Sequence, residues 1–216
     1  MPFNVEQFLE VIKNYNLAIG ILPVVIAFSL GILSIWVLIR KKEYADVVIN
    51  NILAVFWIWN GAVYHLGFFL KINPAARIFG ILFIIQGLLF LYYGNFTRKL
   101  QYTFRKGVYY TIAWVLILYA ILIYNILSPL LGHVYPVAPL FGIAPCPTTI
   151  FTLGIIIFTN EKMPKIILIV PFIWSLVGGS AAIFFGIYED VLLLISGFLT
   201  IALIYFRNKS KNVKQF

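Results

Sequence analysis

The chain has 216 residues, of which 62% are hydrophobic and only 11% are charged. Soluble domains contain about 45–50% apolar and about 25% charged residues, so this composition predicts a protein that resides in a lipid bilayer. It excludes a soluble enzyme, a disordered chain and a coiled coil. The net charge of +9 would otherwise suggest a nucleic-acid partner, but the apolar composition excludes that class as well.

Six charge-free runs define where the chain is able to cross a membrane. A span requires about 20 consecutive apolar residues. Five of the runs fit one span each, and the sixth, 54 residues long, has room for two. We therefore predict an all-α membrane protein, a seven-transmembrane helix bundle. The predicted spans are 17–39, 47–70, 76–94, 108–128, 140–160, 165–187 and 189–206.

The first 14 residues predict a helix that lies on the membrane surface. Asn4 followed by Gln7 resembles a capping pair. Such an amphipathic helix binds in the interface rather than spanning the bilayer. The predicted organisation is an interfacial helix at 1–14, a seven-helix domain at 15–207 and a basic cytoplasmic tail at 208–216. The apolar stripe of the first helix consists of Val5, Phe8, Leu9 and Ile12.

The orientation follows from the lysines and arginines between the spans. Short cytoplasmic loops carry the excess of positive charge, and alternation of the spans places thirteen cations on one side. We therefore predict that the N-terminus faces outward and the C-terminus faces the cytoplasm. The protein is expected in the inner (cell) membrane, with its basic side against anionic lipid of the bilayer. The thirteen cations are Arg40, Lys41, Lys42, Arg98, Lys99, Arg105, Lys106, Lys162, Lys165, Arg207, Lys209, Lys211 and Lys214.

Polar residues inside the predicted spans gather near their outer ends. Unpaired polar groups are costly in the bilayer, so this asymmetry predicts an outward-facing pocket that binds a small solute or ion. His65 and Asp190 are its expected titratable or coordinating groups, and Trp57 and Trp174 are its expected walls. The candidate ligand-binding residues are Asn16, Trp57, Asn60, Tyr64, His65, His133, Cys146, Thr148, Thr149, Trp174, Ser180 and Asp190.

The segment 132–154 contains no charge and four prolines, and it predicts a broken fifth span. Proline removes a backbone donor and clashes with the preceding turn, so no continuous helix passes through all four. We expect a helix that begins at Pro147 with Cys146 as its N-cap, and irregular backbone above it. Irregular backbone at membrane depth requires shelter inside protein or beside a water-filled cavity. The free N–H groups of residues 148–150 would then face the pocket and bind an anion or a carbonyl.

Four stretches carry a resemblance to a known family. They are PFNVEQFLEVIKNYN near the start, WIWNGAVYHLGFFLKINPAA at 57–76, the segment 132–154 and WSLVGGSAAIFFGIYED at 174–190. On these motifs the chain resembles an uncharacterised family of bacterial and archaeal multi-pass integral membrane proteins, defined only as a domain of unknown function. The resemblance implies the same fold throughout and carries over no activity or site residue.

Two chemical alternatives to solute binding stay open. Zinc or copper would accept His65, His133 and Asp190 as ligands, and an open coordination position would activate water. Cys146, the only cysteine, would become a nucleophile at a helix N-terminus with His133 as its base. Either site would make the chain a membrane-embedded enzyme, although no paired metal-binding motif is present in the sequence. Retinal is excluded because the seventh span contains no lysine.

The preferred interpretation is a membrane protein without enzymatic activity that binds a small solute or ion and translocates or senses it. A further alternative is a structural or accessory membrane subunit, in which the polar residues only lock the bundle. The sequence leaves the identity of the ligand and the oligomeric state open.

Overall fold

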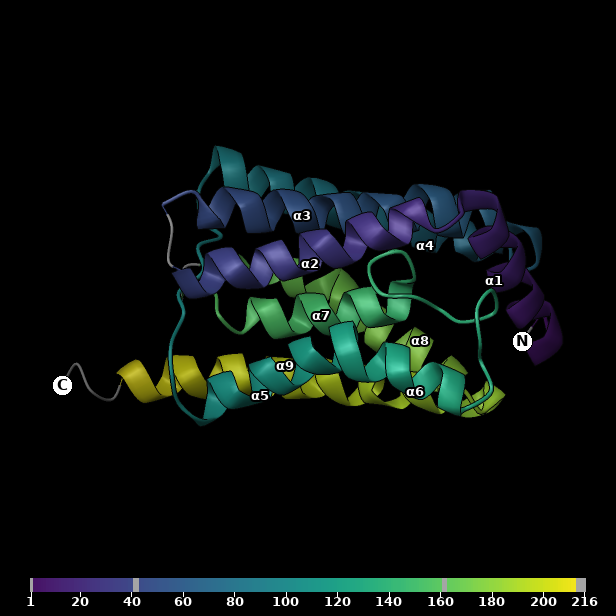
Figure 1. The fold of residues 1–216 in the computed structure, drawn as a ribbon. Coiled ribbons are helices and arrows are strands. Elements are labelled where there is room, and N and C mark those ends of the chain that lie inside the picture. The colour runs from purple at the N-terminus through teal and green to yellow at the C-terminus, as the bar shows by residue number, and fades with distance from the viewer. Residues whose placement is uncertain (1, 41–42, 161–162, 213–216) are drawn as a thin grey trace.

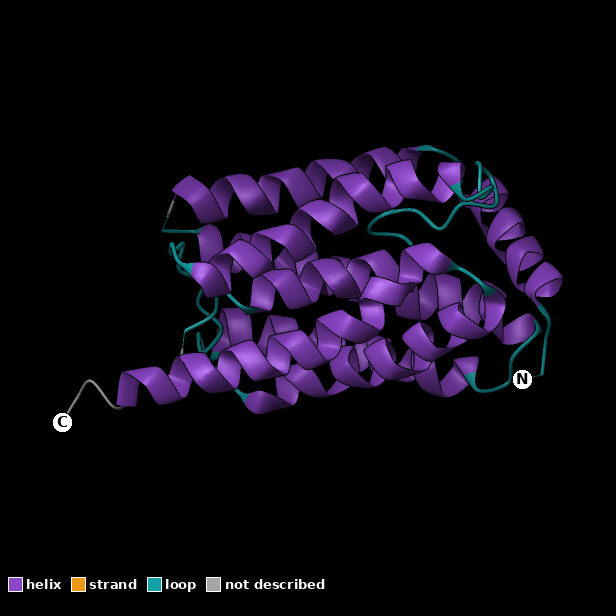
Figure 2. Cartoon of the chain, turned by 90° about the horizontal axis from the view of Figure 1, so that it is seen from below, coloured by secondary structure: helices purple, strands orange, loops and turns teal. Residues whose placement is uncertain are grey.

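The computed structural model describes residues 2–40, 43–160 and 163–212 (Figure 1). Within these ranges the chain forms helices and no strand, and an isolated bridge joins Tyr102 to Thr159. The first helix lies across one end of the bundle, and the other helices run along one long axis (Figures 1 and 2). In chain order the helices are α1 (Val5–Ile19), α2 (Leu22–Arg40), α3 (Ala45–Trp59), α4 (Ala76–Leu91), α5 (Val108–Leu118), α6 (Tyr124–Leu130), α7 (Pro145–Ile156), α8 (Ile169–Phe185) and α9 (Val191–Asn212).

Shorter helical turns extend several of these helices. Wider π-helical turns follow α3 (Asn60–Phe68) and α4 (Tyr92–Phe96), and another joins α5 to α6 (Tyr119–Ile123). Tight 3-10 turns cover Phe69–Lys71, Lys165–Leu168 and Tyr188–Asp190. With these turns included, six helices in the described part of the chain are long and apolar enough to span a membrane. They are Leu22–Arg40, Ala45–Lys71, Ala76–Phe96, Val108–Leu130, Lys165–Phe185 and Tyr188–Asn208.

The capping pair predicted for the first helix is confirmed. The Asn4 side chain accepts a hydrogen bond from the Gln7 N–H at 2.9 Å, and the Gln7 side chain accepts one from the Asn4 N–H at 3.0 Å. The helix continues to Ile19 and ends at Gly20, whose φ of +68° suits glycine. The prediction that a membrane span starts at residue 17 is therefore wrong, because the chain turns at Gly20 before α2 begins.

The predicted fifth span is the element that differs most from expectation. Its helix, α7, has 12 residues and begins at Pro145 with Ala144 as N-cap, so the prediction of Cys146 as N-cap is wrong. Proline is tolerated throughout the first helical turn, where no N–H is needed, so Pro145 starts the helix as well as Pro147 does. Since α7 is shorter than the roughly 20 residues that a span requires, it is not among the six membrane-length helices.

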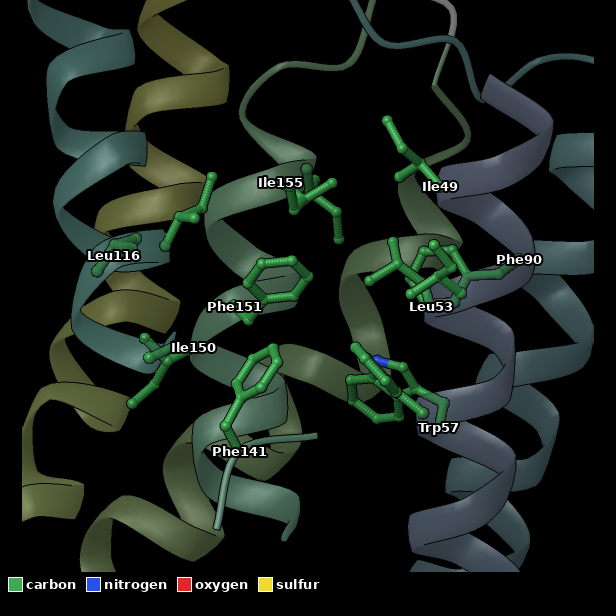
Figure 3. Packing of buried hydrophobic residues seen from close by; sticks show 14 of the residues in the cluster. Ile49, Leu53, Trp57, Phe90, Leu116, Phe141, Ile150, Phe151 and Ile155 are labelled. Atoms are coloured by element: carbon green, nitrogen blue, oxygen red, sulfur yellow. The ribbon is translucent and has the colours of Figure 1, made fainter. Parts of the chain in front are cut away.

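α7 occupies the centre of the bundle. All of its residues except Cys146 are buried, and the helix packs against α3, α5, α8 and α9. Figure 3 shows Ile150, Phe151 and Ile155 filling the space between α5 and α3. Phe151 stacks edge-on against Phe141 with ring centroids 5.1 Å apart. The interior is therefore filled by large apolar side chains rather than by a channel.

The end of the bundle opposite α1 collects the basic segments. The C-termini of α2, α4 and α9 lie there together with the N-terminus of α5 (Figure 1). Arg207, at this end of α9, donates hydrogen bonds of 2.7 Å to the carbonyls of Ile157 and Thr159, which follow α7. Four of the predicted basic residues, Lys41, Lys42, Lys162 and Lys214, lie outside the described residues.

Candidate functional site

The proline-rich loop that follows α6 turns back into the bundle before α7 begins (Figures 1 and 2). Its later part is buried: Ala138, Phe141 and Ile143 are each at most 3% exposed. The irregular backbone that was predicted to precede the helix of the fifth span, now α7, is therefore present, and protein surrounds it. A buried loop must satisfy its polar backbone groups from other parts of the chain.

Side chains from distant helices supply these hydrogen bonds. The Asn16 amide donates to the carbonyls of Pro136 at 2.6 Å and Ala138 at 2.8 Å. The Asn60 amide donates to the carbonyl of Gly142 at 3.1 Å. Asn16 and Asn60 therefore hold the loop in place, which explains why polar residues occur at these positions in apolar helices.

Tyr15 fixes the end of the same loop. Its hydroxyl donates to the carbonyl of Ile143 at 2.8 Å and accepts from the indole N–H of Trp59 at 2.7 Å. Burial raises the pKa of the Tyr15 hydroxyl above its ordinary value, and the bond from Trp59 offsets this only in part. The hydroxyl thus stays protonated and keeps its donor role.

A cavity of about 320 Å³ lies between α1, the end of the loop, α8 and the start of α9. Pockets for small ligands begin at about this size. Most of the lining is apolar, and aromatic rings dominate it. The aromatic lining residues are Phe3, Phe8, Tyr15, Tyr64, Phe69, Phe79, Trp174 and Phe185.

The N-terminal segment closes one side of this cavity. The ring of Phe3 packs against Phe69 and Phe185 at centroid distances of 5.3 Å. The ring of Phe8 stacks on Phe185 at 5.9 Å and meets Phe69 edge-on at 6.1 Å. The four rings form an aromatic cover, which we call the Phe3–Phe8 lid, between α1 and the ends of α3 and α8.

The opposite wall of the cavity carries a carboxylate. Asp190 is 3% exposed and lines the cavity beside Cys146. The Tyr124 hydroxyl donates to Oδ1 of Asp190 at 2.6 Å. No lysine, arginine or histidine is found among the described residues that line the cavity. The carboxylate therefore has a hydrogen-bond donor but no basic side chain within the cavity.

A second carboxylate, Glu189, precedes Asp190 and points to different partners. Its Oε1 lies 2.7 Å from Nδ1 of His133 and accepts a hydrogen bond of 2.9 Å from Ser128. Glu189 is fully buried, whereas the His133 side chain is 14% exposed. This pair ties the loop after α6 to the start of α9.

The structure brings half of the predicted ligand-binding residues to the cavity and places the other half elsewhere. Those that line it are Asn16, Tyr64, Cys146, Trp174, Ser180 and Asp190. Those that do not are Trp57, Asn60, His65, His133, Thr148 and Thr149.

The residues outside the cavity have structural partners. Trp57, predicted as a wall, is buried in the core and donates to the Thr152 hydroxyl at 3.0 Å. The hydroxyls of Thr148 and Thr149 donate to carbonyls one turn back in α7, at 2.7 and 2.8 Å. The prediction of free backbone donors at residues 148–150 is wrong, because Thr148 N–H already bonds to the Ala144 carbonyl. The two prolines of the first turn leave few free donors for an anion.

His65 lies behind the cavity wall rather than in it. Its ring is fully buried and packs against Phe83 at 4.7 Å and Trp174 at 4.9 Å. Neither ring nitrogen has a hydrogen-bond partner among the described residues. No group of three or more His, Cys, Asp or Glu side chains that would hold a metal occurs in the described ranges. His65, His133 and Asp190 consequently do not form the predicted zinc or copper site.

Sequence reasoning missed the aromatic part of the cavity. The apolar stripe of α1 was expected to face lipid, yet Phe8 and Ile12 line the cavity and Val5 does not. The buried face of α1 is Val11, Ile12, Tyr15 and Asn16. The adjacent polar residues Tyr15 and Asn16 at the end of this amphipathic helix could have indicated a buried face. A helix face that buries Asn16 requires contact with protein rather than lipid.

Comparisons with curated proteins and with solved structures give no match. One family model matches the chain over residues 5–215, which is nearly its whole length and includes every element of the cavity beyond the first residues. The chain therefore belongs to DUF6064, a family of unknown function.

Proposed function

We propose that the chain is a multi-pass protein of the inner membrane that binds a small amphipathic amine in the cavity beneath α1. In this proposal the N-terminus lies outside and the C-terminus in the cytoplasm, so the cavity belongs to the outer half of the bundle. The distribution of cations supports the orientation, because the basic segments lie at the end opposite the cavity.

Seven crossings of the membrane are part of the proposal. Six helices have the necessary length and hydropathy. The buried loop and α7 run in series between the two ends of the bundle (Figure 1). Together they make a further crossing whose irregular half is shielded by the surrounding helices, as membrane-embedded backbone requires.

The choice of an amine as the ligand depends on the carboxylate of Asp190. A carboxylate in an apolar cavity is costly unless a partner compensates its charge. Tyr124 offers one hydrogen bond at 2.6 Å but no charge. A ligand ammonium group would supply both charge and donors, and aromatic rings such as Trp174 favour cations near their faces. The apolar body of the same ligand would fill the space beneath the Phe3–Phe8 lid.

The packed interior favours binding or sensing over translocation. Below the cavity, α7 and its neighbours leave Phe151, Leu153 and Ile155 with no exposed surface. A solute that moved to the basic end would have to displace these side chains. A ligand that entered and left through the outer end would leave the core intact.

The thiol of Cys146 provides a direct test. Cys146 is the only cysteine of the chain and lines the cavity, so its rate of modification reports whether the cavity is occupied. We expect phenethylamine to slow the reaction of purified protein with methyl methanethiosulfonate. Phenethyl alcohol and phenylpropionate, which share the apolar body, should protect less.

Two matched substitutions make this test specific. Asp190→Asn should abolish the advantage of the amine over the alcohol. Asp46→Asn, which changes a carboxylate at the basic end, should leave that advantage unchanged. Equal protection by all three compounds, or protection by none of them, would refute the proposed amine site.

The enzymatic alternative has weaker support in the same geometry. A thiol nucleophile at Cys146 would need a base, and His133, the expected base, pairs with Glu189 at 2.7 Å instead.

A further inference from the structure

A second hollow lies at the basic end of the bundle, between α8 and α9. This groove has a volume of about 740 Å³ and shares no lining residue with the cavity beneath α1. Its mouth carries Lys165, Arg207 and Asn208, and its walls are apolar along α8 and α9. We propose that this groove binds one anionic phospholipid, with the phosphate beside Lys165 and an acyl chain between Ile173 and Ile201.

The groove forms because α8 and α9 touch at one end and separate at the other. Near the outer end, a Cβ atom added to Gly179 would lie 2.6 Å from Leu194, so the helices are in close contact there. Towards the basic end, Phe172 and Phe198 stand perpendicular to each other with ring centroids 5.3 Å apart. The helices are still close at this level, because a Cβ atom added to Gly197 would lie 2.7 Å from the Cβ atom of Ser175. The groove lies beyond this contact, towards the basic end.

The depth of the groove matches the structure of a phospholipid. Lys165 and Asn208 stand at the ends of two membrane-length helices, where head groups lie. Ile173 is eight residues along the chain from Lys165, which corresponds to about 12 Å of helix. The groove therefore extends from the head-group level into the hydrocarbon region.

The walls are open to the side as a lipid site requires. Ile169 is 51% exposed and Tyr205 is 61% exposed, although both line the groove. A free phosphate ion would use only the mouth, whereas a phospholipid would also cover these apolar side chains. The exposed apolar walls therefore favour lipid over inorganic phosphate.

The charge at the mouth selects an anionic head group. Lys165 is exposed and forms no ion pair with the residues that the structure describes. Arg207 also lines the groove, where its guanidinium donates to the carbonyls of Ile157 and Thr159. The side-chain oxygen of Asn208, which also lines the groove, accepts a hydrogen bond from Arg207 at 3.2 Å. Basic pockets between membrane helices commonly bind anionic lipid in this way.

The number of lipids that the purified protein retains tests the proposal directly. Purified protein is stripped of lipid in dodecylmaltoside, and dioleoylphosphatidylglycerol or dioleoylphosphatidylcholine is then added. Native mass spectrometry counts the lipids that stay bound. We expect one phosphatidylglycerol to be retained in preference to phosphatidylcholine, and inorganic phosphate to compete weakly.

Three substitutions locate the lipid. Lys165→Gln should weaken phosphatidylglycerol retention about fivefold, as expected for loss of one cation at a membrane surface. Ile173→Trp should weaken retention by filling the groove without any change of charge. Lys71→Gln, at the opposite end, removes the same charge and should have no effect. Both Lys165 and Ile173 are exposed, so the variants should fold as the parent does.

Three results would overturn the proposal. Equal retention of the two lipids would remove the charge selectivity, and equal losses in Lys165→Gln and Lys71→Gln would show that only net charge matters. Full competition by inorganic phosphate would identify a phosphate site without a lipid chain.

Discussion

The hydroxyl of Tyr124 lies 2.6 Å from Oδ1 of Asp190, and both side chains are buried. This contact joins α6 to the start of α9, across 66 residues of sequence. It holds the carboxylate against the wall of the cavity, where the Cys146 thiol is a second hydrogen-bond partner, and Asp190 lines the cavity at the same time. Substitutions of Asp190 separate its role as the acceptor for Tyr124 from its role as the carboxylate of the cavity.

Asp190→Asn should keep the fold, because the asparagine oxygen still accepts the Tyr124 hydrogen bond. Asp190→Leu should lower the free energy of unfolding by about 1–3 kcal/mol, since it leaves a buried hydroxyl without an acceptor. Thermal unfolding in detergent compares the two variants. Equal stability of both would show that the bond from Tyr124 is not important for the fold.

Asn16→Ala should destabilise the buried loop. The change removes the donor for two carbonyls, at 2.6 and 2.8 Å, and an unpaired buried carbonyl costs about 1–3 kcal/mol. The control is Asn14→Ala, two positions earlier on the exposed face of α1. Limited proteolysis of the loop at 131–144 should accelerate in the first variant only. Equal cleavage of both variants would show that Asn16 does not hold the loop.

Gly179→Ala should separate α8 from α9. The added Cβ would lie 2.6 Å from the Leu194 side chain and 2.9 Å from its backbone nitrogen, which cannot move aside without shifting the helix. Overpacking of this kind costs about 1–3 kcal/mol. Gly67→Ala is the matched control, because its nearest neighbour would be 3.7 Å away. Similar melting temperatures for the two variants would contradict the close approach of α8 and α9.

The membrane-length helices could be predicted closely from the sequence, because charge-free length alone defines them. The predicted span 47–70 is observed as Ala45–Lys71, and 76–94 as Ala76–Phe96. These predictions depend only on the hydropathy of consecutive residues and on the rise per residue of a helix, and both are local properties of the sequence.

The return of the proline-rich loop could be predicted only in outline. Four prolines rule out a long helix, but the path of the loop is set by Asn16 and Asn60, which are 120 and 82 residues distant from the carbonyls they bind. The position of His65 was missed for a similar reason. Its neighbour Trp174 comes from α8, and no pattern in the second span reveals that an indole separates the imidazole from the cavity.

His133 and Glu189 should be energetically coupled. Their side chains meet at 2.7 Å, and Glu189 also accepts from Ser128. A double-mutant cycle with His133→Ala and Glu189→Gln should give a coupling free energy of about 1 kcal/mol or more, as for other residues in direct contact. The same cycle between His133→Ala and Asp46→Asn, at opposite ends of the bundle, should give none. Additive effects within the first pair would show that the contact adds nothing to stability.

The Phe3–Phe8 lid should control access to the cavity. The Phe8 ring lies over Phe185 and Phe69 at 5.9 and 6.1 Å, so Phe8→Ala opens a path between α1 and α8 without touching Asp190 or Cys146. We expect severalfold faster modification of Cys146 by methyl methanethiosulfonate, since the reagent reaches the thiol through the outer end. Phe96→Ala is the control, because Phe96 is 80% exposed and belongs to the turn that follows α4. An unchanged rate in Phe8→Ala would mean that ligands enter by another route, most directly from the lipid between neighbouring helices, and that α1 covers the cavity without gating it.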